Sequence, residues 1–203
     1  LDGLFDEDLA SALMEKFPKV VSVIHSVHPE ENNVIMGSLF RTVAGEAQIT
    51  EKLGDLRFSV SAPSFLQVNT KLTETLYRNV VEWLNLRGTE TVIDTYCGIG
   101  TLTGFIAKKS KKVYGIEEVK QAVFDARQNM RDNRIDNCEF EYGRAESVLG
   151  KLSGDNVNVD AMVLDPPRGG CSERVLGHIM QMEPDKIVYV SCNISTLARD
   201  LKY

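Results

Sequence analysis

Short apolar runs alternate with amphipathic segments from residue 91 to the end of the chain, and this alternation restricts the possible folds. The apolar runs cover residues 91–94, 112–116, 138–142, 161–164 and 186–190. The segments with helical spacing cover residues 102–109, 119–133, 145–152, 173–182 and 196 onward. Strands and helices that alternate in this way form a parallel, doubly wound sheet with right-handed crossovers. The sequence therefore predicts an α/β domain with a Rossmann-like sheet.

The first third of the chain has a different pattern. We expect a helix from about residue 4 to 17, short strands at 20–24, 34–36, 47–53 and 56–61, and a hairpin turn at Gly54-Asp55. A helix over residues 70–84 then joins the two regions, with its predicted apolar face formed by Leu72, Leu76, Val80, Val81 and Trp83. We predict a small α+β appendage over residues 1–62 and a Rossmann-like domain over residues 63–203.

Composition places the chain among soluble globular proteins. It has 203 residues, of which 43% are hydrophobic and 26% are charged. No run approaches the roughly 18 apolar residues that a membrane span needs, so no membrane partner is expected. The net charge of −6 argues against nucleic-acid binding by bulk electrostatics. RNA remains possible as a substrate, because a basic groove can be local.

The chain ends and the cysteines bear on its origin. The first residue is Leu1 and no secretory signal follows it, while helical spacing continues to the end near Tyr203. We therefore expect a fragment of a longer protein. The four cysteines form no C-x-x-C pair and have no histidine grouping nearby, so no metal site is predicted. Reduced cysteines are typical of a cytoplasmic protein. The sequence carries no information on the oligomeric state.

Three sequence motifs follow three of the apolar runs. They are Asp94-Thr95-Tyr96-Cys97-Gly98-Ile99-Gly100-Thr101, Leu164-Asp165-Pro166-Pro167-Arg168 and Tyr189-Val190-Ser191-Cys192-Asn193. The carboxyl ends of strands in an open α/β sheet converge on one crevice. We therefore expect the glycine turn, the Asp-Pro-Pro-Arg turn and the thiol to face the same bound molecules. Taken alone, Asp165-Pro166-Pro167 is also consistent with a rigid turn.

The glycine turn favours a nucleoside-containing ligand over a dinucleotide. A dinucleotide fingerprint needs a third glycine at position 103, where this chain has Thr103, and this disfavours a dehydrogenase. Glu117 ends the next strand, where an acid can accept both hydroxyls of a ribose. Spacing alone leaves a second interpretation open, in which Asp94 and Glu117 are two solvated loop acids.

Cys192 has the position of a nucleophile. It lies between an apolar strand and the start of a helix, where unpaired backbone N–H groups favour the thiolate. Cys171, in the loop after Gly169-Gly170, is the second candidate. Phe65 and Leu66 are expected to be core residues rather than residues that stack on a base.

These motifs, together with Phe65-Leu66-Gln67-Val68-Asn69, occur in the order found in the RNA uracil-5-methyltransferase family. The chain resembles the bacterial enzymes that methylate uridine in 23S ribosomal RNA or transfer RNA with S-adenosylmethionine. The resemblance implies a class I methyltransferase sheet and an RNA substrate. It assigns the cofactor pocket to Gln67, Tyr96, Gly98, Thr101, Glu117 and Asp165. Within that set Glu117 would hold the ribose, and Asp165 would lie between the methionine moiety and the target base.

The resemblance also implies the chemistry, in which Cys192 adds to carbon 6 of uracil and carbon 5 then accepts the methyl group. The family's proton-abstracting glutamate is expected beyond Tyr203, and an RNA-binding barrel is expected before residue 1. Some relatives also carry an iron–sulfur cluster, which cannot be placed here. Two positions depart from the family pattern: Arg144 replaces an acid or amide near the adenine, and Ile194 replaces a proline.

The resulting hypothesis is an RNA (uracil-5-)-methyltransferase, with 23S rRNA as the first substrate and transfer RNA as the alternative. A second hypothesis is a non-catalytic module that binds S-adenosylmethionine or RNA. A methyltransferase for another nucleobase is a further alternative, which the setting of the cysteine motif disfavours. The target RNA is chosen by contacts that the fold does not reveal.

Overall fold

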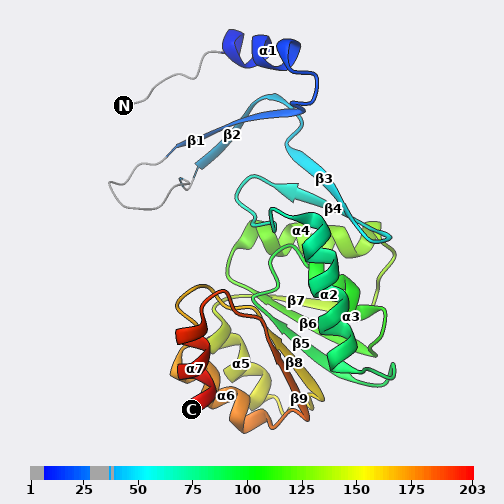
Figure 1. Ribbon diagram of the computed structural model, residues 1–203, viewed down its shortest axis with the longest axis vertical. Helices are drawn as coiled ribbons and strands as arrows, with labels where there is room; N and C mark the ends of the chain where they lie inside the picture. Colours follow the sequence, from blue (N-terminus) through cyan, green and yellow to red (C-terminus); the bar gives the residue numbers. More distant parts are fainter. Residues whose placement is uncertain (1–6, 28–36, 38) are drawn as a thin grey trace.

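The computed structural model describes residues 7–27, 37 and 39–203, and its centre is a five-stranded parallel sheet (Figure 1). The strands are β5 (Thr91–Thr95), β6 (Lys112–Glu117), β7 (Cys138–Tyr142), β8 (Ala161–Leu164) and β9 (Lys186–Tyr189). Their order in the sheet is β7-β6-β5-β8-β9. The chain moves outward from β5 in one direction and then returns to start again at β8. The carboxyl ends of β5 and β8 therefore form the switch point at which ligands bind in open α/β sheets.

Helices cover both faces of this sheet (Figure 1). They are α2 (Thr70–Leu84), α3 (Thr101–Ala107), α4 (Lys120–Asp132), α5 (Ala145–Gly154), α6 (Glu173–Met182) and α7 (Ile194–Lys202). The predicted strands and helices of this region all form, and α7 begins two residues before the predicted start. The prediction of a Rossmann-like α/β fold is confirmed.

Two hydrophobic cores flank the sheet because successive strand residues point to opposite faces. In β5, Val92 belongs to the core under α2, α3 and α4, whereas Ile93 belongs to the core under α5 and α6. Both side chains are fully buried, as are Val163 and Met162 in the neighbouring strand β8. A strand that is buried on both faces has no polar alternation. This explains why the strands appear in the sequence as continuous apolar runs.

The appendage consists of a helix and two antiparallel hairpins. Its elements are α1 (Glu7–Lys16), β1 (Ser22–Val27), β2 (Leu39–Gly45), β3 (Gln48–Leu53) and β4 (Leu56–Ser61). The hairpin β3–β4 forms as predicted around Gly54-Asp55, but β1 begins two residues later than predicted. Strand β2, which pairs with β1, was not predicted. The predicted strand at 34–36 and the first residues of the predicted helix at 4–17 lie outside the described residues.

Side chains of α4 attach the hairpin β3–β4 to the main sheet. The Ser59 N–H donates to Asn129 Oδ1 at 2.8 Å, and the Ser61 N–H donates to Asp125 Oδ2 at 3.1 Å. Asn133, the C-cap of α4, repeats the arrangement a third time by accepting the Arg57 N–H at 3.0 Å. The helix thereby satisfies the outer edge of β4, which would otherwise be open to another strand. Phe58 of this hairpin is fully buried in the core under α2, α3 and α4. The domain division between residues 62 and 63 remains a prediction.

The predicted apolar face of α2 was partly wrong. Leu72 and Trp83 are exposed, at 67% and 63% of their surface. The buried positions of the helix are Thr73, Tyr77, Val80 and Leu84. The side that packs on the sheet therefore includes two hydroxyl-bearing residues, which hydrophobicity alone does not reveal.

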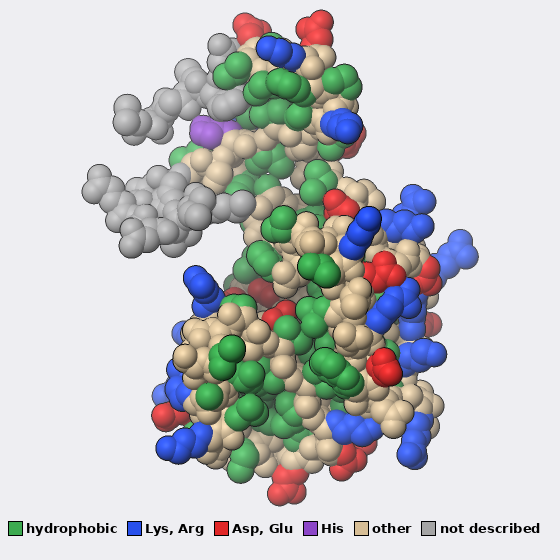
Figure 2. All heavy atoms as spheres, viewed as in Figure 1, with side chains coloured by type: hydrophobic (Ala, Val, Ile, Leu, Met, Phe, Trp, Pro, Cys, Tyr) green, Lys and Arg blue, Asp and Glu red, His purple; other side chains and the backbone are tan. Residues whose placement is uncertain are grey.

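Charged side chains of both signs lie around the rim of the view in Figure 2, and hydrophobic side chains gather toward its centre. A hollow separates the β1–β2 hairpin from the main body, and Ile24, Phe40, Gln121 and Phe124 are among its lining residues. No helix of the described residues is long and apolar enough to cross a membrane.

Candidate active site

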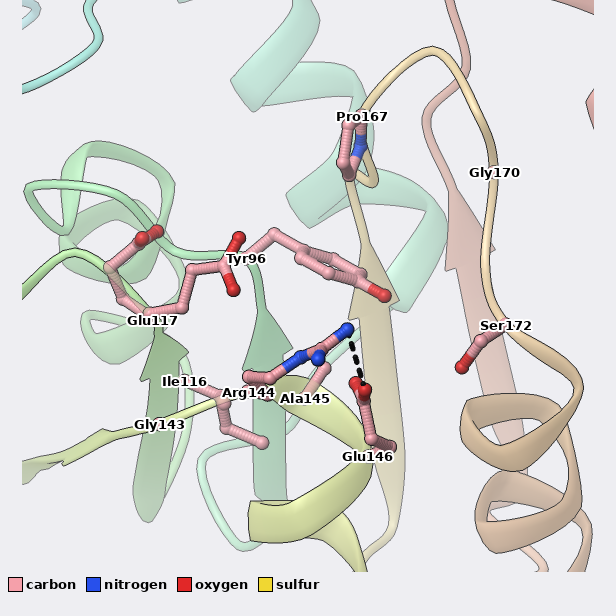
Figure 3. A pocket seen from close by; sticks show the side chains of 11 residues that line it. Tyr96, Ile116, Glu117, Gly143, Arg144, Ala145, Glu146, Pro167, Gly170 and Ser172 are labelled. Carbon is pink, nitrogen blue, oxygen red and sulfur yellow. Dashed lines mark ion pairs between the residues drawn. The ribbon is translucent and has the colours of Figure 1, made fainter. Parts of the chain in front are cut away.

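Two pockets open at the carboxyl ends of β5, β6 and β8, and both include Tyr96. The first, here called the Glu117 pocket, is also lined by Glu118, Arg144, Glu146, Pro167, Gly170 and Ser172. Figure 3 shows Glu117 at one end of this pocket and Ser172 at the other, with the Tyr96 ring between them. The second, here called the Asp165 pocket, is also lined by Phe65, Gln67, Asp94, Gly98, Thr101 and Asp165. The structure thus brings all six residues predicted for the cofactor pocket to one edge of the sheet.

The turn after β5 has an unusual backbone. Gly98 and Gly100 have φ values of 55° and 79°, and Tyr96 has a φ of 67° although it is not a glycine. Such a conformation is costly for a residue with a Cβ, and it is concentrated at functional sites. A Cβ on Gly98 would meet open space, whereas one on Gly100 would lie 3.2 Å from Phe140 Cζ. Gly100 therefore serves packing, while the Gly98 backbone is left open to a ligand.

The carboxylate of Glu117 is fixed by two backbone donors. The Gly98 N–H donates to Oε2 at 3.0 Å, and the Val119 N–H donates to Oε1 at 2.8 Å. An ionised carboxylate offers about four acceptor positions. Each oxygen of Glu117 can therefore accept one further bond from the pocket side. This geometry suits a pair of neighbouring hydroxyl groups.

The second pocket contains two carboxyl groups with raised pKa values. Burial raises the pKa of Asp94 to about 7, while the hydroxyl of Thr103, which donates to its Oδ2 at 2.5 Å, acts in the opposite direction. Burial also raises the pKa of Asp165 to about 6. Strand β5 carries Asp94, and Asp165 directly follows β8, the neighbouring strand in the sheet. Negative charge on both groups at once is therefore disfavoured near neutral pH.

Helix α2 contributes to the same pocket. The hydroxyl groups of Tyr77 and Thr101 lie 2.9 Å apart and share a hydrogen bond, and both residues are buried. Burial raises the pKa of Tyr77 to about 12, so the phenol remains protonated. Tyr77 was not predicted as a site residue. The only sequence feature that could have indicated it is its position as a tyrosine in the helix before the glycine turn. Phe65 was expected in the core, but it is 71% exposed and lines the Asp165 pocket. Leu66 packs against the core as expected.

Cys192 lies on an exposed turn between β9 and α7. Asn193 caps the helix, because its Oδ1 accepts the Ser195 N–H at 3.0 Å, and Ile194 is the first helical residue. That first position is the one at which helices tolerate proline best, so Ile194 can replace the family's proline without altering the turn. The Asn193 amide Nδ2 donates to the Arg168 carbonyl at 3.4 Å, which connects the thiol turn to the Asp-Pro-Pro-Arg turn. Cys192 is not among the lining residues of either pocket, and its role remains a prediction.

The alternative nucleophile, Cys171, is only 4% exposed, and burial raises the pKa of its thiol. A buried neutral thiol is a poor nucleophile. The structure therefore favours Cys192 over Cys171. Among the described residues, no group of three or more histidine, cysteine or acidic side chains could hold a metal ion.

Comparison with known proteins identifies the family. A family model described as tRNA (Uracil-5-)-methyltransferase matches residues 41–203. The chain belongs to this family. An uncharacterized RNA methyltransferase from Bacillus cereus is 48% identical over 92% of the chain, and one from Halalkalibacterium halodurans is 45% identical over 96% of it. These matches cover 41% and 42% of the two relatives, so the chain spans about two fifths of their length.

Solved structures agree with this assignment. The tRNA (uracil-54, C5)-methyltransferase of Pyrococcus abyssi, in complex with S-adenosyl-L-homocysteine, is similar with a TM-score of 0.74 and 33% identity. The similarity covers 90% of this chain and 44% of the archaeal one. A putative SAM-dependent methyltransferase from Streptococcus mutans has a TM-score of 0.63 and 11% identity, over 97% of this chain and 55% of its own. At that identity the second likeness concerns the fold alone.

In this member of the uracil-5-methyltransferase family, the wall of the Glu117 pocket includes residues that sequence reasoning did not select. Arg144 pairs with Glu146 at 3.0 Å (Figure 3). The departure from an acid or amide at position 144 therefore places an ion pair in this wall. Ser172 caps α6 by accepting the Val175 N–H at 3.4 Å, and it lines the same pocket. Arg144 and Ser172 are far apart in the chain, and they line one pocket only because β7 and β8 lie in one sheet.

Proposed function

We propose that this chain carries the methyltransferase core of an enzyme that methylates carbon 5 of uridine in RNA. The observation that carries the proposal is the convergence of three groups at one edge of the sheet. Glu117 ends β6 with its carboxylate fixed by backbone donors, Asp165 follows β8, and the thiol turn follows β9. Family membership supports the same reaction class.

The residues of the pockets fit S-adenosylmethionine. Glu117 has free acceptor positions for two ribose hydroxyls, and Gly98 has open space on the side where a Cβ would stand. Gln67, Tyr96, Thr101 and Asp165 would surround the rest of the cofactor. When bound, this group supplies an electrophilic methyl group on a sulfonium sulfur. The related P. abyssi structure, which contains S-adenosyl-L-homocysteine, supports the assignment.

Cys192 supplies the activation that the pyrimidine needs. Carbon 5 of uracil is too weak a nucleophile to take a methyl group directly. Addition of the Cys192 thiolate to carbon 6 forms a carbon–sulfur bond and moves an electron pair onto the ring as an enolate, which makes carbon 5 nucleophilic. After methylation, loss of the proton at carbon 5 lets the carbon–sulfur bond break and returns the thiolate. We assign no residue of this chain to that proton transfer.

Two RNAs are candidate substrates: 23S rRNA, which we propose from the resemblance of the sequence motifs, and transfer RNA. The second candidate is favoured by the description of the matching family and by the tRNA enzyme of P. abyssi at 33% identity. The sheet and its pockets fix the reaction, whereas contacts to the RNA fix the target. The two candidates therefore share the site and differ only in what brings uridine to it.

The test uses the full-length protein with S-adenosylmethionine and unmodified transcripts of each RNA. Digestion and mass spectrometry should detect 5-methyluridine in one of the two RNAs. Product in transfer RNA alone would replace the first candidate by the second. If the protein binds S-adenosylmethionine yet forms 5-methyluridine in neither RNA, the proposed reaction is wrong and the non-catalytic module becomes the better explanation.

A further inference from the structure

One face of α7 is bonded to the loop that follows the Asp-Pro-Pro-Arg turn. Arg199 donates from Nη2 to the carbonyls of Gly169 at 2.9 Å and Cys171 at 3.1 Å. The Thr196 hydroxyl lies 3.0 Å from the Asn193 carbonyl and 3.3 Å from the Arg168 carbonyl, and Asn193 Nδ2 donates to the Arg168 carbonyl at 3.4 Å. Positions spaced by three residues lie on one side of a helix. The loop therefore lies along the face of the helix whose first turn follows Cys192.

Asp200 is the buried centre of this contact. Its side chain has no exposed surface, and it accepts the Cys171 N–H at 2.7 Å and the Tyr189 hydroxyl at 2.6 Å. Arg199 donates to its other oxygen from Nε at 2.8 Å and from Nη2 at 2.6 Å. A buried carboxylate is tolerated only with such a set of donors. Asp200 thereby joins the helix, strand β9 and the loop at a single carboxylate.

The loop that Asp200 holds is also a wall of the Glu117 pocket. Gly170 lines that pocket, and a Cβ at Gly170 would lie 2.5 Å from Asp200 Oδ2 and 2.7 Å from Arg199 Nη2. Its φ of 75° also favours glycine. Pro167 lines the pocket from the other end of the loop, and the Tyr96 hydroxyl donates to Cys171 Sγ at 3.9 Å. The Gly170 wall therefore packs directly on Asp200, and the Tyr96 ring contacts the same loop at Cys171.

We propose that Arg199 and Asp200 are positioning residues that fix the wall of the cofactor pocket relative to the Cys192 turn. The inference rests on the proposed function, because it gives a reason why the methyl donor and the nucleophile need a constant separation. Neither residue lines the pockets, so they act through the loop and the helix. Misplacement of a reacting group by about 1 Å can reduce a rate by about a hundredfold. The contacts of Arg199 and Asp200 would keep the distance between the cofactor pocket and the Cys192 turn constant.

The first arm of the test needs no ligand and uses amide hydrogen exchange followed by mass spectrometry. We compare the full-length protein with its Arg199→Gln and Asp200→Asn variants, and Lys202→Gln is the control because it removes one charge from the same helix. The expected result is faster exchange in both the loop 168–171 and the first turn of α7, with β5 unchanged. Faster exchange in only one of the two segments, or in neither, would overturn the link. Arg199 is 57% exposed, so its variant remains informative if Asp200→Asn fails to fold.

The second arm adds saturating S-adenosyl-L-homocysteine. Because coupling between sites is reciprocal, binding in the pocket should slow exchange in the first turn of α7 by about fivefold or more in the parent chain and the control. This slowing should be lost in Arg199→Gln and Asp200→Asn, although both variants still bind the ligand. Slowing that persists in these variants would overturn the proposal. If the full-length parent protein binds no ligand, the proposed function is wrong, and the ligand-free arm still decides the link by itself.

Discussion

The cofactor half and the thiol half of the site are built in opposite ways. The cofactor half lies inside the sheet, where Asp94 is completely buried and burial raises its pKa. The thiol half lies on an exposed turn after β9, and the helix that follows it, α7, carries the buried Asp200. Burial acts to raise the pKa of Asp200 too, but donors from Tyr189, Cys171 and Arg199 outweigh it and lower the pKa. The cofactor half thus contains a carboxyl group, Asp94, that resists ionisation. The thiol half contains a carboxylate, Asp200, that stays ionised.

The two halves of the site also differ in what positions their functional groups. Binding groups are positioned by the strands themselves, because backbone donors such as the Gly98 N–H lie at the strand ends. The thiol turn follows β9, but the bonds that join it to the neighbouring loop come from the side chains of Asn193 and Thr196. Substitutions in the cofactor half should therefore change stability and ligand affinity, whereas substitutions at the thiol should change chemistry alone.

The largest expected effect is on the pH dependence of stability. The folded-state pKa of Asp94, about 7, exceeds its unfolded value of about 3.9. Its contribution to stability is therefore fully present below about pH 4 and is lost as the pH rises through about 7, on the order of a few kcal/mol. Denaturant unfolding of Asp94→Asn between pH 4 and pH 8 should show a flatter profile than the parent chain. An identical profile would show that Asp94 is not protonated in the fold.

Asp200 should give the opposite pH dependence of stability. Its folded-state pKa is lowered, so its contribution is present above the unfolded value and is lost as the pH falls through the folded one. Asp200→Asn should therefore reduce the loss of stability on acidification while leaving the profile above pH 5 parallel to that of the parent. If the two variants altered the same pH range, the contrast between the halves would be wrong.

A substitution at Gly115 tests how tightly β6 packs against Phe140 and the glycine turn. A Cβ there would lie 2.6 Å from Phe140 Cδ1 and 2.9 Å from Sγ of Cys97, which precedes Gly98 in the chain. Overpacking of this kind costs about 1–3 kcal/mol, so Gly115→Ala should lower the free energy of unfolding by that amount. The control is Gly169→Ala in the loop beside the thiol turn, where a Cβ meets nothing within 4 Å. Equal stability of the two variants would contradict the account of the packing.

Glu117 tests the ribose assignment with a smaller effect. Glu117→Gln loses the charge and one acceptor, so affinity for S-adenosyl-L-homocysteine should fall by about tenfold, or about 1.4 kcal/mol. Glu118→Gln is the matched control, because Glu118 lines the same pocket and carries the same charge. Isothermal titration calorimetry measures both. A similar loss in the two variants would mean that general electrostatics, rather than the fixed carboxylate, holds the ligand.

The sheet could be predicted from the sequence because its strands are buried on both faces. Val92, Ile93 and their neighbours form apolar runs that have few other structural interpretations. Strand β2 was missed because it has no fully buried residue, so its side chains carry no alternation. Phe65 was placed in the core on hydrophobicity alone, which does not distinguish a core residue from one at the mouth of a pocket.

The motifs predicted which residues gather at the site but not how they are held. The left-handed backbone of Tyr96 and the donors to Glu117 depend on strand register, which no local pattern reveals. The network around Asp200 joins residues that are up to 30 positions apart in the chain, from Gly169 to Arg199, and it has no sequence signature of its own. Long-range polar contacts are therefore the part of the site that only the fold supplies.

Covalent capture of RNA that contains 5-fluorouridine tests the proposed role of Cys192 as the nucleophile. Fluorine at carbon 5 cannot leave as a proton does, so the adduct between thiol and carbon 6 should persist on a denaturing gel when the full-length protein is supplied with S-adenosylmethionine. We expect the adduct in the parent protein and in Cys171→Ala, and none in Cys192→Ala, which should still bind S-adenosyl-L-homocysteine with unchanged affinity. An adduct of undiminished yield in Cys192→Ala would show that Cys192 is not the nucleophile.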